Sequence, residues 1–320
     1  MVGEICVLDT GYKSYDYEER LFRESGYEFR LFDGLREDLE EKLRFARNAT
    51  GIFIRWIRIS EKELAMFPNL KVIVRYGTGY ENINLEACRK AGVKVANVSG
   101  YANHSVSNHA LAFIYACSRD LLTGNNKFAS IFAKPPDEKV FDLNEKTLGI
   151  VGLGRIGTTL ASKARYLFKK VLATDPYIED DKFNKFGVIK TAFKDLLSNS
   201  DFISIHCNLT EETRHMFNQT AFEIFKANMV LVNTARGPVI ETNSLLKALD
   251  SDKIFRAGLD VFDSELPEEI PESLVKHPKV IATGHYAWYS VSSHLELQKR
   301  AADNMLGLLE GKEVEDCLVN

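Results

Sequence analysis

The chain has 320 residues, of which 45% are hydrophobic and 27% are charged, and its formal net charge is −4. This composition is typical of a soluble globular protein with room for two domains, and the acidic balance argues against direct binding to nucleic acid. No apolar run approaches the roughly 18 residues that a membrane span needs.

The cysteines and the N-terminus indicate where the protein works. Five scattered cysteines, none in CxxC spacing, indicate free thiols in a reducing compartment and give no pattern for a metal site. The N-terminus lacks the basic and then apolar pattern of a signal peptide. We therefore expect a cytoplasmic protein that acts on a small molecule, without a metal or a membrane partner.

The first hundred residues alternate between short β-rich runs and polar, amphipathic stretches. We expect strands over residues 4–9, 27–32, 51–56, 71–77 and 93–98. These runs contain β-branched residues with little polar alternation, as expected when helices cover both faces of a sheet. The order of elements predicts an α/β fold with a parallel, doubly wound sheet.

Residues 101–146 break this alternation. The pattern predicts one long helix over residues 103–122, followed by an irregular stretch that contains Pro135 and Pro136. Such a segment is either a linker or an arm that embraces a second subunit, and the pattern does not distinguish the two.

The alternation resumes at Thr147 and predicts a second α/β unit. We expect its strands over residues 147–154, 169–175, 186–190, 201–208, 229–235, 254–263 and 279–285. A last helix is expected over residues 295–311, where a glycine would end it.

A glycine-rich turn joins the first of these later strands to a helix. It contains Gly152, Gly154 and Gly157 in GxGxxG spacing. In a dinucleotide site the first glycine permits the tight turn, the second lets the backbone approach the pyrophosphate, and the third lets the helix pack on the strand. The N-terminus of the helix then favours the anion. A plain glycine turn is the alternative, but the flanking strand and helix favour a cofactor site.

The next strand ends in Asp175, 18 residues beyond Gly157. A carboxylate at this place accepts a hydrogen bond from the ribose 2′-hydroxyl of NAD and repels the 2′-phosphate of NADP. The sequence therefore predicts NAD as the cofactor.

Three further strands end in residues that are suited to acid–base chemistry. Arg236 follows one strand, Asp260 and Glu265 follow the next, and His285 follows the last. Because ligands bind at the carboxyl ends of the strands in an open α/β sheet, these side chains are expected to converge. Arginine can hold a carboxylate with two hydrogen bonds, histidine can exchange a proton near neutral pH, and a neighbouring glutamate would stabilise the imidazolium. Each residue alone could instead be an ordinary surface or core group.

The chain resembles the D-isomer-specific 2-hydroxyacid dehydrogenases over essentially its whole length. The resemblance rests on the segments GLGRIG, NTARG, GLDVFDSE and TGH in that order, with RYGTGYENIN upstream. It implies an enzyme that transfers hydride reversibly from NADH to a 2-oxo acid and gives an (R)-2-hydroxy acid. By resemblance, Arg236 binds and orients the substrate. His285 is the acid/base with Glu265 as its partner, and Asp260 holds the nicotinamide carboxamide.

The same resemblance, together with the glycine-rich turn, gives the remaining expected contacts. The expected cofactor contacts are Thr78, Gly152, Gly154, Arg155, Ile156, Gly157, Asp175, Cys207, Thr213, Thr234, Ala235 and Asp260. The expected substrate contacts are Arg75, Tyr76, Gly77 and Trp288.

The resemblance also implies two doubly wound parallel-sheet domains. A flavodoxin-like substrate domain is expected over residues 1–100 and 290–320, with a Rossmann NAD-binding domain inserted in it over residues 101–289. Residues 101–146 resemble the dimerisation arm of the family, so a homodimer is expected.

The segment HYAWYS, residues 285–290, departs from the glycine-rich ending that is common in the family. It is similar to the C-terminal-binding-protein branch, which contains NAD(H)-binding transcriptional corepressors. An alternative function is therefore an NAD(H)-sensing, corepressor-like binding protein with weak dehydrogenase activity. Trp288 is either a wall of the substrate pocket or a side chain packed at the domain hinge. Gly284 stands where most of the family has proline before the histidine.

Overall fold

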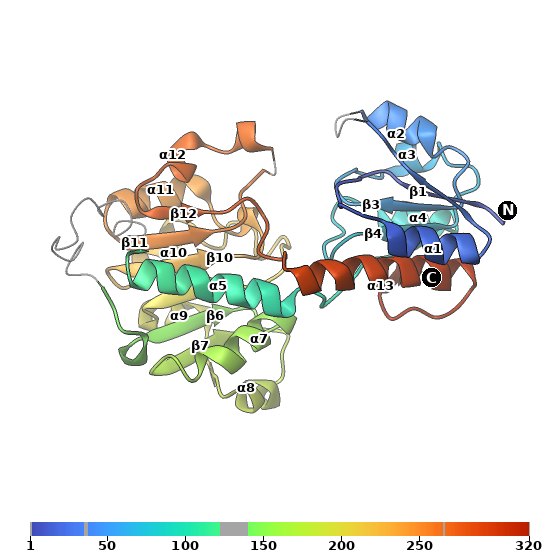
Figure 1. The fold of residues 1–320 in the computed structure, drawn as a ribbon. Coiled ribbons are helices and arrows are strands. Elements are labelled where there is room, and N and C mark those ends of the chain that lie inside the picture. The colour runs from blue at the N-terminus through green and yellow to red at the C-terminus, as the bar shows by residue number, and fades with distance from the viewer. Residues whose placement is uncertain (1, 35–37, 122–139, 265, 320) are drawn as a thin grey trace, which may run out of the picture. The chain divides into compact units, whose positions relative to one another are not determined.

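The structure is a computed structural model, and it describes residues 2–34, 38–121, 140–264 and 266–319 (Figure 1). The chain forms two compact units. The first unit combines residues 1–101 with residues 290–320, and the second unit contains residues 102–289.

The first unit contains a six-stranded sheet in the order β13-β5-β4-β3-β1-β2. Its strands are β1 (Glu4–Val7), β2 (Glu28–Leu31), β3 (Gly51–Ile54), β4 (Val72–Arg75), β5 (Lys94–Ala96) and β13 (Cys317–Val319). The five strands from the N-terminal part are parallel and follow the flavodoxin-like order 2-1-3-4-5.

One edge of this sheet differs from the prediction of a wholly parallel sheet. Strand β13 pairs with β5 in the antiparallel direction, with Cys317 opposite Ala96. The last helix returns the chain to this edge, where antiparallel pairing lets it satisfy the backbone groups of β5 without a crossover. Val319 is buried at this edge.

Five helices lie in the described part of the first unit. They are α1 (Asp16–Glu24), α2 (Leu39–Phe45), α3 (Glu61–Leu64), α4 (Leu85–Lys90) and α13 (Val291–Leu309). Helix α13 begins four residues earlier than the apolar pattern predicts, because Ser290 and Ser293 form a reciprocal capping box at its start.

The second unit contains a seven-stranded sheet in the order β12-β11-β10-β9-β6-β7-β8, and all its pairs are parallel. Its strands are β6 (Thr147–Val151), β7 (Lys170–Thr174), β8 (Ile189–Lys190), β9 (Phe202–Ile205), β10 (Met229–Asn233), β11 (Ile254–Leu259) and β12 (Val280–Ala282). The strand order reverses at β6 and β9, as in a Rossmann fold. The two sheets confirm the predicted fold class.

Helices cover both faces of the second sheet. They are α5 (Asn103–Ser118), α7 (Arg155–Ala164), α8 (Asp180–Phe186), α9 (Phe193–Asn199), α10 (Gln219–Ile224), α11 (Thr242–Asp250) and α12 (Glu272–Val275). Helix α5 packs against α7 and lies across β10 and β11 (Figure 1). It ends at Ser118, four residues before the predicted end, and much of the predicted arm lies outside the described residues.

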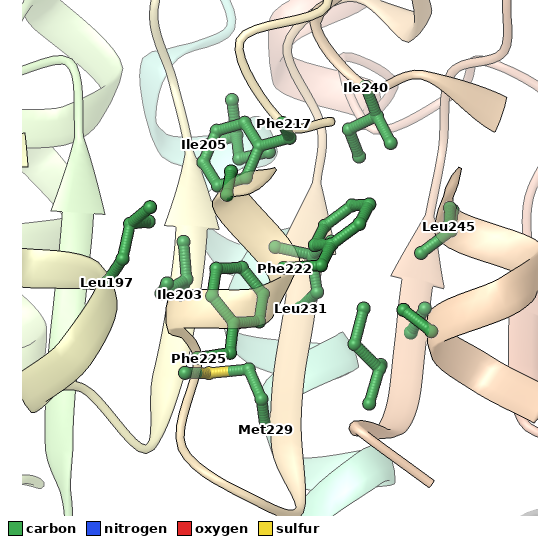
Figure 2. Packing of buried hydrophobic residues seen from close by; sticks show 14 of the residues in the cluster. Leu197, Ile203, Ile205, Phe217, Phe222, Phe225, Met229, Leu231, Ile240 and Leu245 are labelled. Atoms are coloured by element: carbon green, nitrogen blue, oxygen red, sulfur yellow. The ribbon is translucent and has the colours of Figure 1, made fainter. Parts of the chain in front are cut away.

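Two apolar layers hold these helices against the sheet. On one face, the rings of Phe217, Phe222 and Phe225 pack with Met229 and Leu231 (Figure 2). On the other face, residues of α5 and α7 pack against β6 and β10. Every residue of β10 and β11 is buried, which explains why their sequences show no polar alternation.

Two observations concern the whole set of described residues. None of the helices seen in them is both long and apolar enough to cross a membrane. All five cysteines are free thiols, and three of them, Cys6, Cys88 and Cys117, are buried.

Candidate active site

Most of the predicted residues that the structure describes in the second unit follow strand ends along the carboxyl edge of its sheet. The last register pairs across the sheet are Ala282–Leu259, Leu259–Asn233, Asn233–Ile205, Ile205–Val151 and Val151–Thr174. The residues that follow these strand ends are therefore neighbours. In strand order they are His285, Asp260, Thr234 to Arg236, Cys207, Gly152 and Asp175.

The glycine-rich turn has the shape that a dinucleotide pyrophosphate requires. Gly152 has a φ of 92°, and a Cβ atom there would lie 2.5 Å from the backbone nitrogen of Cys207. A Cβ atom at Gly157 would lie 2.0 Å from the carbonyl oxygen of Gly152. At Gly154, by contrast, no described heavy atom lies within 4 Å of a built Cβ, so this part of the backbone is open to a ligand. The glycine-rich turn therefore fits the pyrophosphate of NAD.

Helix α7 begins directly at this turn. Gly154 is its N-cap residue, and the first two helical residues are the exposed Arg155 and the half-buried Ile156. Free N–H groups at the start of a ten-residue helix, with an exposed guanidinium beside them, favour an anion.

Asp175 has a structural as well as an expected binding role. One carboxylate oxygen accepts a hydrogen bond from the backbone nitrogen of Leu153 at 2.8 Å, and the other accepts one from Tyr177 at 3.0 Å. The acid at the end of β7 thus fixes the glycine-rich turn. Its oxygens retain lone pairs for a ribose hydroxyl.

Cys207 and Thr213 frame the loop that follows β9. Burial raises the pKa of the Cys207 thiol to about 11, so the thiol stays protonated at neutral pH. The hydroxyl of Thr213 donates to the carbonyl oxygen of Asn208 at 2.7 Å and accepts from the backbone nitrogen of Thr210 at 2.8 Å. These bonds close the turn, so the position of Thr213 is set by the loop itself.

The segment Thr234–Arg236 is fixed by the last residue of β10. The buried Asn233 side chain accepts from the nitrogen of Ala235 at 3.0 Å and donates to the carbonyl oxygen of Arg236 at 2.9 Å. The guanidinium of Arg236 donates to the carbonyl oxygen of Ala235 at 2.8 Å. The buried hydroxyl of Thr234 has no partner among the described residues. A buried hydroxyl without a partner at a strand end can bond a ligand.

Asp260 is almost fully buried and organises the segment that carries His285. Its carboxylate accepts from the backbone nitrogens of Tyr286 at 3.1 Å and Ala287 at 2.9 Å, and from the hydroxyl of Thr283. Its carbonyl oxygen accepts from the nitrogen of His285 at 2.8 Å. By resemblance Asp260 is expected to contact nicotinamide, and the structure adds this role in holding the segment around His285.

His285 is half-buried and has a backbone φ of 54°, in the left-handed region that non-glycine residues seldom occupy. Trp288 lies next to it, because its indole nitrogen donates to the carbonyl oxygen of His285 at 3.0 Å. A Cβ atom on Gly284 would meet no described heavy atom within 4 Å, so crowding does not explain the glycine at this position. Glu265, the expected partner of His285, lies outside the described residues.

The remaining predicted residues, Arg75 to Thr78, lie at the end of β4 and directly after it in the first unit. The Val98 nitrogen donates to the carbonyl oxygen of Gly77 at 3.0 Å, and the Thr78 hydroxyl donates to the carbonyl oxygen of Val98 at 3.0 Å. A Cβ atom on Gly77 would lie 1.8 Å from a terminal nitrogen of Arg75, so the guanidinium folds over Gly77. The loop is thus tied to the end of β5.

The side chain of Tyr76 points into the core of the first unit and is 1% exposed. Its ring stacks on Phe53, and its hydroxyl donates to the buried Glu18 at 3.2 Å. Burial raises the pKa of Glu18. Only the backbone of Tyr76 is therefore available to a ligand.

Sequence reasoning missed three residues of this region. Asn233 fixes the segment Thr234–Arg236. His109 is hydrogen-bonded to Thr283, which in turn donates to Asp260. Asn233 precedes Thr234 directly, so a polar residue ending a buried strand was a usable signal. His109 lies in α5, 174 residues from Thr283, and no local sequence pattern predicts the contact between them.

Comparisons with known proteins agree with this geometry. The family model described as "D-isomer specific 2-hydroxyacid dehydrogenase, NAD binding domain" matches residues 111–287. A glyoxylate reductase from Thermococcus litoralis is 33% identical over 82% of this chain and 81% of its own length. A hydroxypyruvate reductase from Thermotoga maritima is 36% identical over 72% of this chain and 74% of its own. The crystal structure of a D-lactate dehydrogenase from Aquifex aeolicus, complexed with NAD and lactic acid, superposes with a TM-score of 0.87 over 99% of both chains at 25% identity.

Proposed function

The chain belongs to the D-isomer-specific 2-hydroxyacid dehydrogenase family, and from that premise we propose that it reduces a 2-oxo acid to the (R)-2-hydroxy acid with NADH, in a reversible reaction. It is an NAD-dependent oxidoreductase that acts on the CH–OH group of 2-hydroxy acids. The observation that supports the proposal most is the single row at the carboxyl edge of the second sheet. The glycine-rich turn, Arg236 and His285 follow strands of that one sheet.

We assign the reaction to three side chains. Arg236 holds the substrate carboxylate and polarises its carbonyl oxygen, since a guanidinium offers two parallel donors. His285 gives its proton to that oxygen as the carbonyl is reduced, and takes it back in the reverse direction. Glu265 is assigned as the partner that orients the imidazole. NADH supplies the hydride when it is bound.

We assign the cofactor contacts, apart from Thr78, to the second unit and several substrate contacts to the first. Gly152, Gly154 and Gly157, with the start of α7 at Arg155 and Ile156, would hold the pyrophosphate. Asp175 would hold the adenosine ribose. The remaining assigned cofactor contacts are Thr78, Cys207, Thr213, Thr234, Ala235 and Asp260, and the assigned substrate contacts are Arg75, the backbone of Tyr76, Gly77 and Trp288.

We propose small 2-oxo acids such as glyoxylate and hydroxypyruvate as the first substrates to test, because the names of the two relatives support them. The position of Trp288 next to His285 supports a role for its indole as a wall for the substrate side chain. Bulkier acids such as phenylpyruvate and 4-methylthio-2-oxobutanoate therefore belong in the same panel.

The test is oxidation of NADH by the purified protein in the presence of that panel, with pyruvate included. We expect His285→Ala and Arg236→Ala each to lower the rate by about 10²- to 10⁴-fold. His215→Ala is the matched control, because His215 is an exposed histidine of the same unit that also has a positive φ, of 52°. If no acid is reduced, or if His285→Ala keeps the full rate, the proposal is wrong.

The likeness of HYAWYS to the C-terminal-binding-protein branch supports a second candidate, an NAD(H)-sensing binding protein. A protein of that kind would capture a partner protein in an NADH-dependent way while turning substrates over slowly. Affinity capture with and without NADH, set beside kcat on the best acid, separates the two candidates. Fast turnover without NADH-dependent capture supports the enzyme alone.

We also propose that the protein is a cytoplasmic homodimer whose arm is the segment 101–146. The exposed side chains of Tyr115 on α5 and of Leu121 shortly after it support an apolar contact there. Light scattering coupled to gel filtration measures the mass directly, and a monomer of 36.2 kDa would contradict the proposal.

A further inference from the structure

Three side chains from distant parts of the second unit are joined in series. His109 on α5 places its Nε2 atom 3.0 Å from the hydroxyl oxygen of Thr283, which follows β12. The Thr283 hydroxyl donates to the carboxylate of Asp260, which follows β11. The series connects a helix on one face of the sheet to the segment that carries His285.

The direction of the proton in each bond follows from the last member. The Asp260 carboxylate already accepts from the backbone N–H groups of Tyr286 and Ala287, and an ionised carboxylate is an acceptor only. The single hydroxyl proton of Thr283 therefore points to Asp260. Its oxygen is left to accept, so the Nε2 atom of His109 must carry a proton.

The surroundings of His109 hold its ring in this orientation. The ring makes edge-to-face contacts with Phe113, at 4.6 Å between centroids, and with Tyr286, at 5.3 Å. Burial lowers the pKa of His109 against the opposing effect of the Asp260 charge, which favours the neutral ring with one N–H group. A neutral imidazole with its proton on Nε2 is the form that the series requires.

Asp260 also fixes the backbone on either side of His285. Its carboxylate and carbonyl oxygens together accept hydrogen bonds from Thr283, His285, Tyr286 and Ala287, so the segment 283–287 is wrapped around one residue. Within that segment His285 has a φ of 54°. A left-handed backbone at a non-glycine residue persists only when the surrounding structure holds it. A small shift of Thr283 or Asp260 would therefore move the imidazole of His285.

We propose that His109 is a positioning residue for His285, acting through Thr283 and Asp260. The proposal rests on the function proposed above only in so far as His285 is the acid/base. Because His109 is placed outside the reacting groups, its loss should reduce kcat by misplacing the imidazole.

The kinetic test uses variants that separate hydrogen bonding from size. We expect His109→Leu and Thr283→Val each to lower kcat by about 10- to 100-fold, as misplacement of a catalytic group by about 1 Å does. Combining the two should cost little more than either alone, because both break one series. His109→Gln, whose side-chain amide can donate in place of Nε2–H, and Thr283→Ser, which keeps the hydroxyl, should recover most of the rate. His104→Leu on the same helix is the control, since His104 is exposed. A wild-type kcat in His109→Leu, or no rescue by His109→Gln, would overturn the proposal.

A second measurement needs no turnover. In ¹⁵N-histidine-labelled protein at neutral pH, the ring of His109 should be the tautomer with its proton on Nε2. Thr283→Val should shift the ring resonances of both His109 and His285, whereas His104→Leu should leave those of His285 unchanged. A His109 proton on Nδ1, or an unshifted His285, would overturn the positioning role even in an active enzyme. The expected resonances in a protein that reduces no 2-oxo acid would support the positioning role and contradict only the proposed reaction.

Discussion

The indole nitrogen of Trp288 lies 3.0 Å from the carbonyl oxygen of His285 and donates a hydrogen bond to it. This bond fixes the tryptophan ring relative to the backbone of the histidine three residues earlier. The backbone around His285 is thus fixed by two residues: Asp260 accepts hydrogen bonds from the nitrogens of Tyr286 and Ala287, and Trp288 donates one to the carbonyl oxygen of His285. Trp288 is either a pocket wall or a packed hinge residue. The two alternatives can be separated, because only a pocket wall makes the effect of a Trp288 substitution depend on the size of the substrate.

Trp288→Phe removes the indole N–H group and keeps an aromatic ring. Since one hydrogen bond contributes about 0.5–1.5 kcal/mol, kcat should fall by roughly 2- to 10-fold to a similar extent for every 2-oxo acid. Trp288→Ala should also change KM according to the size of the substrate side chain if the indole is a wall. Steady-state kinetics with glyoxylate and phenylpyruvate measure both effects, and Tyr289→Phe in the same segment is the control. An unchanged kcat in Trp288→Phe would show that the bond does not position His285.

Asp175 should decide the choice of cofactor, and two variants separate its two roles. Asp175→Asn removes the charge but keeps an oxygen that can accept from the Leu153 nitrogen, so NADPH should gain relative to NADH while the turn stays intact. Asp175→Ala also frees the turn, so the KM for NADH should rise by on the order of 10- to 100-fold, the effect of losing a charged hydrogen bond. The KM values for both cofactors provide the test, with Asp180→Asn as the control. A wild-type protein that uses NADPH better than NADH would contradict the role of Asp175.

His206 should make the second unit less stable in mild acid. Burial lowers the pKa of His206 from 6.5 to about 3, so the folded state keeps the ring neutral while the unfolded state becomes protonated below pH 6.5. The stability linked to His206 is therefore complete above that pH and is lost as the pH falls toward 3. Between pH 7 and pH 5 the loss should be about 2 kcal/mol.

The variant His206→Gln tests this linkage. Glutamine can still reach the hydroxyl of Ser204, which lies 2.8 Å from the Nε2 atom of His206, but it does not titrate. Urea unfolding of the variant should show a weaker dependence on pH between 7 and 5 than unfolding of the wild type, whatever the stability at pH 7. His104→Gln should keep the wild-type dependence. Parallel pH curves for His206→Gln and the wild type would contradict the prediction.

A buried ion pair joins the turn after α5 to β11. One carboxylate oxygen of Asp120 accepts from Nε of Arg256 at 3.0 Å and from its Nη2 at 2.7 Å, and the Asp120 side chain is 1% exposed. Removing one member leaves the other charge buried, so Asp120→Ala should lower the free energy of unfolding by about 3–5 kcal/mol. Combining it with Arg256→Met should recover part of that loss.

The neighbouring pair of Arg119 and Asp142 is the surface control for this experiment. Its side chains are 51% and 74% exposed, and exposed pairs contribute less than about 1 kcal/mol. Asp142→Ala should therefore change the urea midpoint only slightly. Equal losses in Asp120→Ala and Asp142→Ala would show that burial of the pair is not the cause.

The inner strands of both sheets could be predicted because a strand covered on both faces is an apolar run that ends at polar residues. The run of β10 ends at Asn233 and the run of β11 ends at Asp260, where the predicted site begins. Strand β13 could not be predicted in this way. Its three residues pair with β5 about 220 positions earlier, and a short edge strand has no apolar run of its own.

The sequence predicts the candidate site as a set of strand ends, but not as a set of contacts. The rule that ligands bind at the carboxyl ends of parallel strands places Arg236 and His285 on one edge without any distance. The bond between His109 and Thr283 depends on the rotation of α5 over the sheet, which no local pattern determines. The positive φ of His285 could not be predicted either, because such a backbone conformation is expected of glycine. It follows from the wrapping of residues 283–287 around Asp260.

The left-handed backbone at His285 has an evolutionary consequence. A side chain in this conformation costs about 1–2 kcal/mol relative to the right-handed region, and glycine alone avoids that cost. Selection for stability alone would therefore favour glycine at position 285, and only selection for the imidazole opposes this change. In a descendant that kept the fold as a mere NADH sensor and no longer needed proton transfer, this position should be among the first to change, and the change should raise the melting temperature.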